Sequence, residues 1–93
     1  MALITLRGTV RERVEFSAQT LSRKLKAAAL EGMTIGEGVP APLEKAKTYY
    51  RFQVSLRGSS SVRLARLARG VLDALPMPED VFVAVDKDPL HLM

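Results

Sequence analysis

The first third of the chain contains two hydrophobic patterns, a short run followed by a series of steps of three and four, and each pattern predicts one kind of element. Residues 2–6, ALITL, form a short apolar run that Arg7 and Gly8 end, so we expect a strand there. From about Thr9 onward, apolar residues follow at steps of three and four, namely Val10, Val14, Ala18, Leu21, Leu25 and Ala28. Since such steps place side chains on one stripe of a helix, the segment predicts an amphipathic helix that Gly32 ends.

The remainder of the chain predicts the order strand, helix, strand. Residues 33–37, MTIGE, predict a weak strand, and the prolines and glycine of residues 38–42, GVPAP, exclude regular structure. Residues 49–57 predict a half-buried strand by strict alternation, with one side formed by Tyr50, Phe52, Val54 and Leu56 and the other by Tyr49, Arg51, Gln53, Ser55 and Arg57. Gly58 and the three serines that follow predict a turn with helix N-cap chemistry. A second helix then runs to about Leu75 before two prolines, and residues 81–85, VFVAV, predict the last strand.

This order, βαββαβ, predicts an α+β fold of the split βαβ type. We expect a two-layer sandwich in which both helices cover one face of a four-stranded, mainly antiparallel sheet. The 93 residues are the size of one domain, spanning 1–93, and we expect it to be a monomer in isolation.

The composition indicates the cellular compartment in which we expect this domain. Cysteine is absent, which excludes disulfides and thiolate metal sites and fits a reducing compartment. The start, MALITLRG, lacks the features of a signal peptide because its apolar run is short and Arg7 interrupts it. No apolar stretch approaches the roughly 20 residues that a membrane helix needs. We therefore expect a soluble, cytoplasmic protein with no membrane partner.

Charge is distributed unevenly along the chain. The net charge is +4, yet residues 45–72 hold no acidic residue and seven basic ones: Lys45, Lys47, Arg51, Arg57, Arg63, Arg66 and Arg69. A one-sided block of this kind favours an anionic partner.

The second predicted helix carries the most regular part of this basic block. Arg63, Arg66 and Arg69 step by three on the side opposite the apolar residues. They form either a solvated face without a partner or a docking surface for phosphates. Arg51, Arg57, Lys45 and Lys47 nearby in sequence favour the second interpretation, as do Ser60 and Ser61 at a helix N-terminus, where backbone N–H groups bind anions. If both helices cover one sheet face, however, the strand arginines need not share a surface with the helix arginines.

Aromatic residues offer a second kind of candidate contact. Tyr50 and Phe52 belong to the core by alternation, whereas Tyr49 lies on the polar side, where bases could stack on it. Phe16 falls on the side of the first helix opposite its apolar stripe. It is either an isolated exposed aromatic or a contact with a neighbouring domain.

Catalytic and metal-binding motifs are absent from the sequence. There is no nucleophile, base and orienting group in a recognisable set, no Walker loop and no GxGxxG motif, so we do not expect an enzyme. Asp86, Asp88 and His91 could approach a divalent cation, but a polar exit from the last strand explains them better, and we expect no metal or cofactor in this chain. Gly70 lies within the second helix, where we expect close packing against a neighbour to explain it.

Three stretches follow one another in a recognisable order: VPAPLEKAKTYYRFQVSLRG, SSVRLARLARGVLDAL and VFVAVDKDPLHLM. With them, the chain resembles over nearly its whole length the C-terminal domain of primosomal protein N′, a bacterial replication-restart helicase. The three stretches match a P-x-P loop with a basic spacer and a Y-R-[FWY]-Q strand, an R-L helix with a central glycine, and a last strand closing in D-x-D-P. Met1 to Ile4 and Arg7-Gly8 also match the way that domain begins.

The resemblance implies a fold like a small ribosomal protein of the split βαβ type and a non-catalytic role. Such a domain docks forked or single-stranded DNA onto the helicase beside the motor lobes, and contacts the acidic tail of single-stranded-DNA-binding protein. The parent would be an ATP- and magnesium-dependent 3′–5′ DNA helicase that contains zinc, but this chain holds neither Walker motifs nor cysteine clusters.

The chain departs from the family pattern at two places. The family often has Gly-Pro where this chain has Glu37-Gly38. Where some members carry Arg and Gln for the acidic tail, this chain has Ser61 and Ala65, so our hypothesis is that Arg63 or Arg66 replaces them, with Phe16 as a further partner contact. Two other functions stay open: a scaffold domain on the helicase lobes without DNA affinity of its own, and a free-standing ribosomal-type RNA-binding protein.

Overall fold

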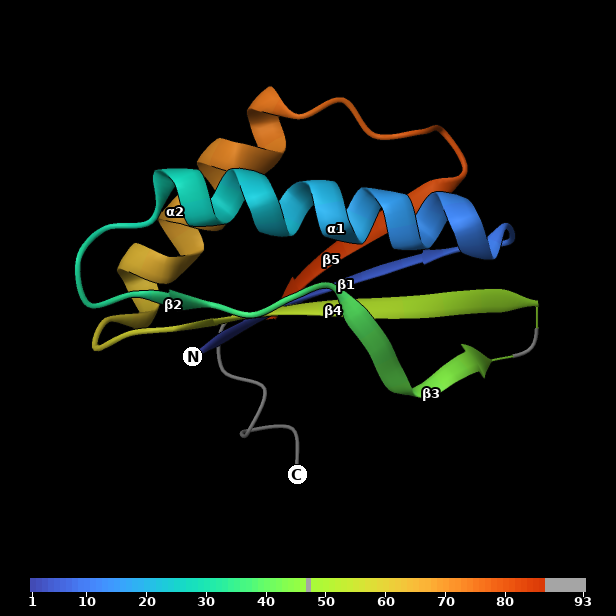
Figure 1. The fold of residues 1–93 in the computed structure, drawn as a ribbon, viewed down its shortest axis with the longest axis horizontal. Coiled ribbons are helices and arrows are strands. Elements are labelled where there is room, and N and C mark those ends of the chain that lie inside the picture. Colours follow the sequence, from blue (N-terminus) through green and yellow to red (C-terminus); the bar gives the residue numbers. More distant parts are fainter. Residues whose placement is uncertain (47, 87–93) are drawn as a thin grey trace.

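The fold is α+β, as the sequence predicts, and consists of an antiparallel sheet and two helices (Figure 1). The computed structural model describes residues 1–46 and 48–86, with the side chains of all of these except 43–46. In chain order the elements are β1 (Ala2–Gly8), α1 (Arg11–Ala28), β2 (Thr34–Ile35), β3 (Val39–Ala46), β4 (Tyr49–Arg57), α2 (Ser61–Ala74) and β5 (Val81–Asp86).

The sheet has five strands where the sequence predicted four, because the segment after α1 forms two strands. β1 pairs with β4 on one side and with β5 on the other, and β2 and β3 share the remaining edge of β4. β2 meets the end of β4 through Thr34 opposite Arg57, and β3 continues along β4 from Val39 opposite Gln53. All of these pairs are antiparallel.

The prediction that GVPAP has no regular structure was wrong, since Val39–Ala46 form β3. Proline lacks an N–H donor, which an outer strand does not need on its solvent side, and the residue before a proline favours extended backbone. β3 lies at the sheet edge, and its pairing register with β4 shifts between Pro40 and Lys45. A sequence that cannot form a central strand therefore still forms an irregular edge strand.

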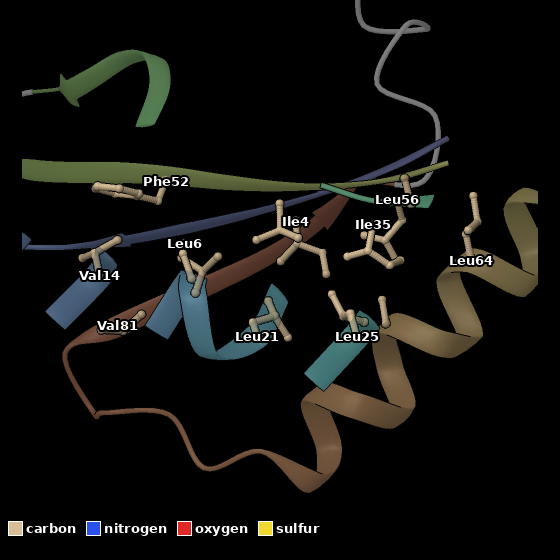
Figure 2. Packing of buried hydrophobic residues seen from close by; sticks show 14 residues of the cluster. Ile4, Leu6, Val14, Leu21, Leu25, Ile35, Phe52, Leu56, Leu64 and Val81 are labelled. Atoms are coloured by element: carbon tan, nitrogen blue, oxygen red, sulfur yellow. The ribbon is translucent and has the colours of Figure 1, made fainter. Parts of the chain in front are cut away.

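The core lies between one face of the sheet and the two helices (Figures 1 and 2). Alternate residues of β1 and β4 are fully or almost fully buried, namely Ala2, Ile4 and Leu6 with Phe52, Val54 and Leu56. They meet Val14, Ala18, Leu21 and Leu25 of α1 and Leu64 and Ala68 of α2. The predicted apolar stripe of the first helix is thus confirmed in its centre, whereas Val10 precedes the helix and Ala28 is exposed at its end.

Two boundaries of α1 differ from the prediction. The helix begins at Arg11 and ends at Ala28, four residues before the glycine expected to end it. Gly32 lies instead in the following turn, where Met33 N donates to Leu30 O at 3.1 Å and the glycine has φ of 88°. This conformation suits glycine because an L side chain rarely adopts it.

Polar groups of α1 fix the break between β2 and β3. Gln19 Nε2 donates to Gly38 O and Ser22 Oγ donates to Gly36 O, both at 2.7 Å. Gly38 approaches the helix so closely that a Cβ on it would lie 2.8 Å from the carbonyl carbon of Ala18. The buried Ser22 is therefore satisfied, and the helix and the interrupted edge strand are held together by hydrogen bonds as well as by packing.

Candidate nucleic-acid interface

The exposed face of α2 is the first part of the candidate interface. Arg63, Arg66 and Arg69 are all exposed, on the side away from the buried Leu64 and Ala68. Within residues 1–46 and 48–86 none of the three arginines forms an ion pair. No neighbouring carboxylate in this part of the chain therefore neutralises the three guanidinium groups.

The predicted N-cap at the start of α2 is confirmed. Ser60 Oγ accepts a hydrogen bond from Arg63 N at 3.3 Å, and Ser60 O accepts one from Leu64 N at 3.1 Å. The hydroxyl thus satisfies one of the N–H groups that a helix leaves free in its first turn. Ser61 is the first residue of the helix and is half-buried.

The three helix arginines border three different hollows. Arg63 lies beside Ser59, Ser60 and the turn at residues 30–33. Arg66 lines a groove of about 490 Å³ between α1 and α2, together with Lys24, and Arg69 lies beside residues 83–85 of β5. The place of Lys24 in this groove could not be predicted from the sequence, because nothing in the pattern of α1 shows which part of its polar side approaches α2.

Arg51 and Arg57 lie on the other side of the molecule from these hollows. They alternate with Phe52, Val54 and Leu56, which point toward the helices, so within the described residues the two arginines belong to the sheet face that neither α1 nor α2 covers. The predicted basic site is therefore divided between two surfaces. Lys47 and the side chain of Lys45 lie outside the described part of the structure.

The uncovered sheet face holds a cluster that the sequence analysis missed. Arg7 Cζ lies 5.3 Å from the centre of the Tyr49 ring and 5.5 Å from the centre of the Phe82 ring, which are cation–π distances. We call Arg7, Tyr49 and Phe82 the open-face cluster. Tyr49 was a candidate platform in the sequence, but Phe82 stands in the uniformly apolar run VFVAV, which does not show which residues face outward.

The other aromatic predictions have mixed outcomes. Phe52 is buried, as alternation predicted, and Tyr50 is only half-buried. Phe16 is 68% exposed, as predicted, and borders a hollow of about 300 Å³ that also involves residues 75–78. The hollow at Phe16 is not lined by Arg63 or Arg66, and the hollows at these two arginines are not lined by Phe16.

The explanation expected for Gly70 was wrong. A Cβ built on Gly70 would have no atom within 4 Å beyond its own helix and chain neighbours, so no close neighbour requires a glycine there. The residue is exposed and lines the groove between α1 and α2. Its position at the groove is the only structural feature that we can associate with it.

Across the described residues, no group of three or more His, Cys, Asp or Glu side chains could hold a metal ion. Asp88 and His91 lie outside that part of the structure, which ends at Asp86. Neither α1 nor α2, the helices in the described ranges, has the length and apolar character needed to cross a bilayer.

Comparison with protein-family models finds no matching family, and comparison with curated proteins finds no significant match.

Proposed function

We propose that this chain is a non-catalytic domain that binds forked DNA through the phosphate backbone and docks a partner protein, like the C-terminal domain of a replication-restart helicase. One observation carries the proposal: Arg63, Arg66 and Arg69 follow one another along the exposed face of α2 without an ion pair in the described residues. Six residues of helix span roughly 9 Å, at 1.5 Å per residue. That span is comparable with the rise of two to three phosphates along one DNA strand, at about 3.4 Å each.

The finer features of the fold support the same proposal. We infer a split βαβ arrangement of the ribosomal-protein type in which β2 and β3 represent one interrupted strand. The observed order β2-β4-β1-β5, with β3 on the same edge as β2, is consistent with it. Both helices then cover one face, as Figure 1 illustrates.

Partner docking is assigned to the groove between α1 and α2. Apart from Lys24 and Arg66 its lining is formed by Gly70 and apolar residues, namely Ala28, Leu67, Val71, Ala74 and Leu75. A groove with an apolar floor and two cations suits a short peptide that carries both apolar and acidic residues, such as the tail of single-stranded-DNA-binding protein. This geometry favours Arg66 over Arg63 as the residue that replaces the family's tail contacts.

The DNA proposal is tested by charge reversal on α2. Fluorescence anisotropy of a labelled fork is measured at two salt concentrations for the unmodified chain, R63E and R66E. We expect each reversal to weaken binding and to reduce the slope of log K against log salt by about one per lost phosphate contact. The matched control is R23E, which makes the same charge change on an exposed arginine of α1.

Two results would contradict the proposal. If R63E and R66E bind the fork as the unmodified chain does, α2 does not contact phosphate. If R23E weakens binding as much as R66E, only the net charge matters and no docking surface exists.

The groove also supports a second candidate function, a scaffold domain that packs on helicase lobes and has no DNA affinity of its own. It is favoured by the apolar floor of the groove beside Gly70. Under this alternative the isolated chain shows no salt-dependent binding to any fork, and a helicase-lobe fragment protects Leu67 and Val71 in NMR titration. A preference for structured RNA over the fork would instead indicate an RNA-binding protein.

A further inference from the structure

The uncovered face of the sheet carries aromatic, cationic and hydrogen-bonding side chains in ordered rows. Arg51, Arg7 and Phe82 lie opposite one another on β4, β1 and β5, and form one row. The next row is Gln53, Thr5 and Ala84, and the third is Ser55, Leu3 and Asp86. Tyr49 stands two residues before Arg51 on the same side of β4, so it lies next to the first row.

The planar side chains lie in the first row and next to it. The guanidinium of Arg7 lies within 5.5 Å of the centres of two rings, and Phe82 is still 50% exposed. The cluster lines a hollow of about 710 Å³ together with Thr5, Arg51, Ala84 and Asp86. Aromatic rings and guanidinium planes are the groups on which unpaired bases stack.

The charge of this face complements a polyanion. Arg7, Arg51 and Arg57 lie on the described part of the face, and Asp86 is the one acidic residue in the three rows. None of the three arginines forms an ion pair within the part of the chain that the structure describes. A protein partner with an apolar surface would leave these guanidinium groups without counter-charges, whereas a phosphate backbone would pair with them.

The open face is continuous with the basic helix around one sheet edge. β5 is the outer strand, and its residues 83–85 line both the hollow at Arg69 and the hollow of the open face. A single DNA strand that leaves the α2 surface at Arg69 therefore reaches the open-face cluster by passing over β5.

We propose that the sheet face that neither α1 nor α2 covers binds single-stranded DNA, with bases stacked on Tyr49, Phe82 and the guanidinium plane of Arg7, and with Arg51 beside the backbone. The inference rests on the proposed function, since it assigns the unpaired arm of the fork to this face and the duplex arm to α2. Duplex DNA does not suit the open face, because its bases are already stacked on one another and offer no free ring surface to the cluster.

The test uses the full chain and a dT oligonucleotide of about ten nucleotides, which fits the usual site sizes of stacking proteins. We expect Y49L and F82L each to weaken dT binding about 10-fold, because leucine keeps apolar surface but removes the ring face. F16L is the matched control, since Phe16 is equally aromatic and 68% exposed on α1, and we expect it to bind dT as the unmodified chain does. R7K, which keeps the charge and loses the guanidinium plane, is expected to weaken binding about as much as the ring variants.

The fluorescence of Tyr49 reports on DNA binding directly, without a comparison between variants of different stability. The chain contains two tyrosines and no tryptophan, so Y50F leaves Tyr49 as the sole tyrosine. We expect dT to quench the fluorescence of Tyr49 in Y50F at concentrations that saturate binding. Duplex of the same length is expected to leave that fluorescence unchanged.

The outcomes separate this inference from the proposed function. If Y49L and F82L bind dT like F16L, or if Tyr49 is not quenched, the open face does not stack bases, and R66E still reports on the fork independently. If the ring variants lose dT binding but R63E and R66E bind the fork normally, the open face is a DNA site and the α2 assignment fails. Binding of rU with no binding of dT would overturn the assignment to DNA.

Discussion

Replacing Gly70 by alanine is expected to stabilise this domain, because the glycine lies within a helix at a position where no neighbouring element requires it. Gly70 belongs to the interior of α2, four residues before its last residue, Ala74. A methyl group at this position would meet no atom of a neighbouring element within 4 Å. The substitution therefore adds a good helix former and removes no contact.

The expected gain follows from helix propensity alone. Alanine is favoured over glycine in a helix interior by about 0.8–1.0 kcal/mol, since glycine loses more conformational freedom on folding. No contact is gained at Gly70 that would add to this value, and no close approach subtracts from it. For a domain of this size, 1 kcal/mol corresponds to a rise in Tm of about 4–8 °C.

Gly38→Ala is the matched control, because it makes the same chemical change at a crowded position. A Cβ at Gly38 would lie 2.8 Å from two atoms of Ala18, one of them backbone, so the two elements would have to separate. Overpacking of this kind costs about 1–3 kcal/mol. Both variants restrict the unfolded chain equally, so the opposite signs would report on the folded structure.

Thermal and urea unfolding followed by circular dichroism measure both variants. A fall in the Tm of G70A would refute the reasoning, since it would require a contact or a backbone conformation at Gly70 that the structure does not contain. G70A also tests the groove: the added methyl group would occupy space where the partner peptide is proposed to dock. A more stable variant with weaker peptide binding is therefore expected.

Three other predictions concern stability. Ser60→Ala removes the N-cap of α2 and is expected to cost about 1 kcal/mol, whereas Ser60→Gly costs a few tenths, both measured by urea unfolding. Leu21→Ala empties part of the core at a fully buried position and is expected to cost about 2–5 kcal/mol, visible as a large loss of Tm. Arg13 and Asp80 form an ion pair at 3.0 Å between side chains that are 61% and 33% exposed, so a double-mutant cycle should give no more than about 1 kcal/mol.

The elements with strong periodicity could be predicted from the sequence because burial imposes that periodicity. β4 alternates because its two faces have different surroundings, and the steps of three and four in α1 place Val14, Ala18, Leu21 and Leu25 against the sheet. β3 could not be predicted by the same means. It is an edge strand with prolines, and its pairing register with β4 shifts between Pro40 and Lys45, so it lacks the regular pairing of a central strand.

The sequence predicted the division of the basic residues between two surfaces only for the case that both helices cover one face of the sheet. Alternation already placed Arg51 and Arg57 opposite Phe52, but which side of β4 the helices would cover follows from packing of elements distant in sequence. The open-face cluster was harder to predict, because it joins β1, β4 and β5. Arg7 ends an apolar run and Phe82 lies inside one, and neither pattern shows that the two side chains meet Tyr49.

The α2 surface and the open face meet at β5, the outer strand of the sheet. In the part of the chain that the structure describes, α1 and α2 lie on one sheet face, and the other face carries arginines rather than a second apolar stripe. Since β5 is the outer strand and its residues 83–85 line both the hollow at Arg69 and the hollow of the open face, the two surfaces adjoin around one edge of the sheet. At a DNA fork, a duplex becomes an unpaired strand within one nucleotide. The proposed sites for the duplex and for the unpaired strand are likewise adjacent. The proposed pairing of a backbone-binding helix with a base-stacking sheet accounts for the division of the basic residues, which neither proposed site accounts for alone.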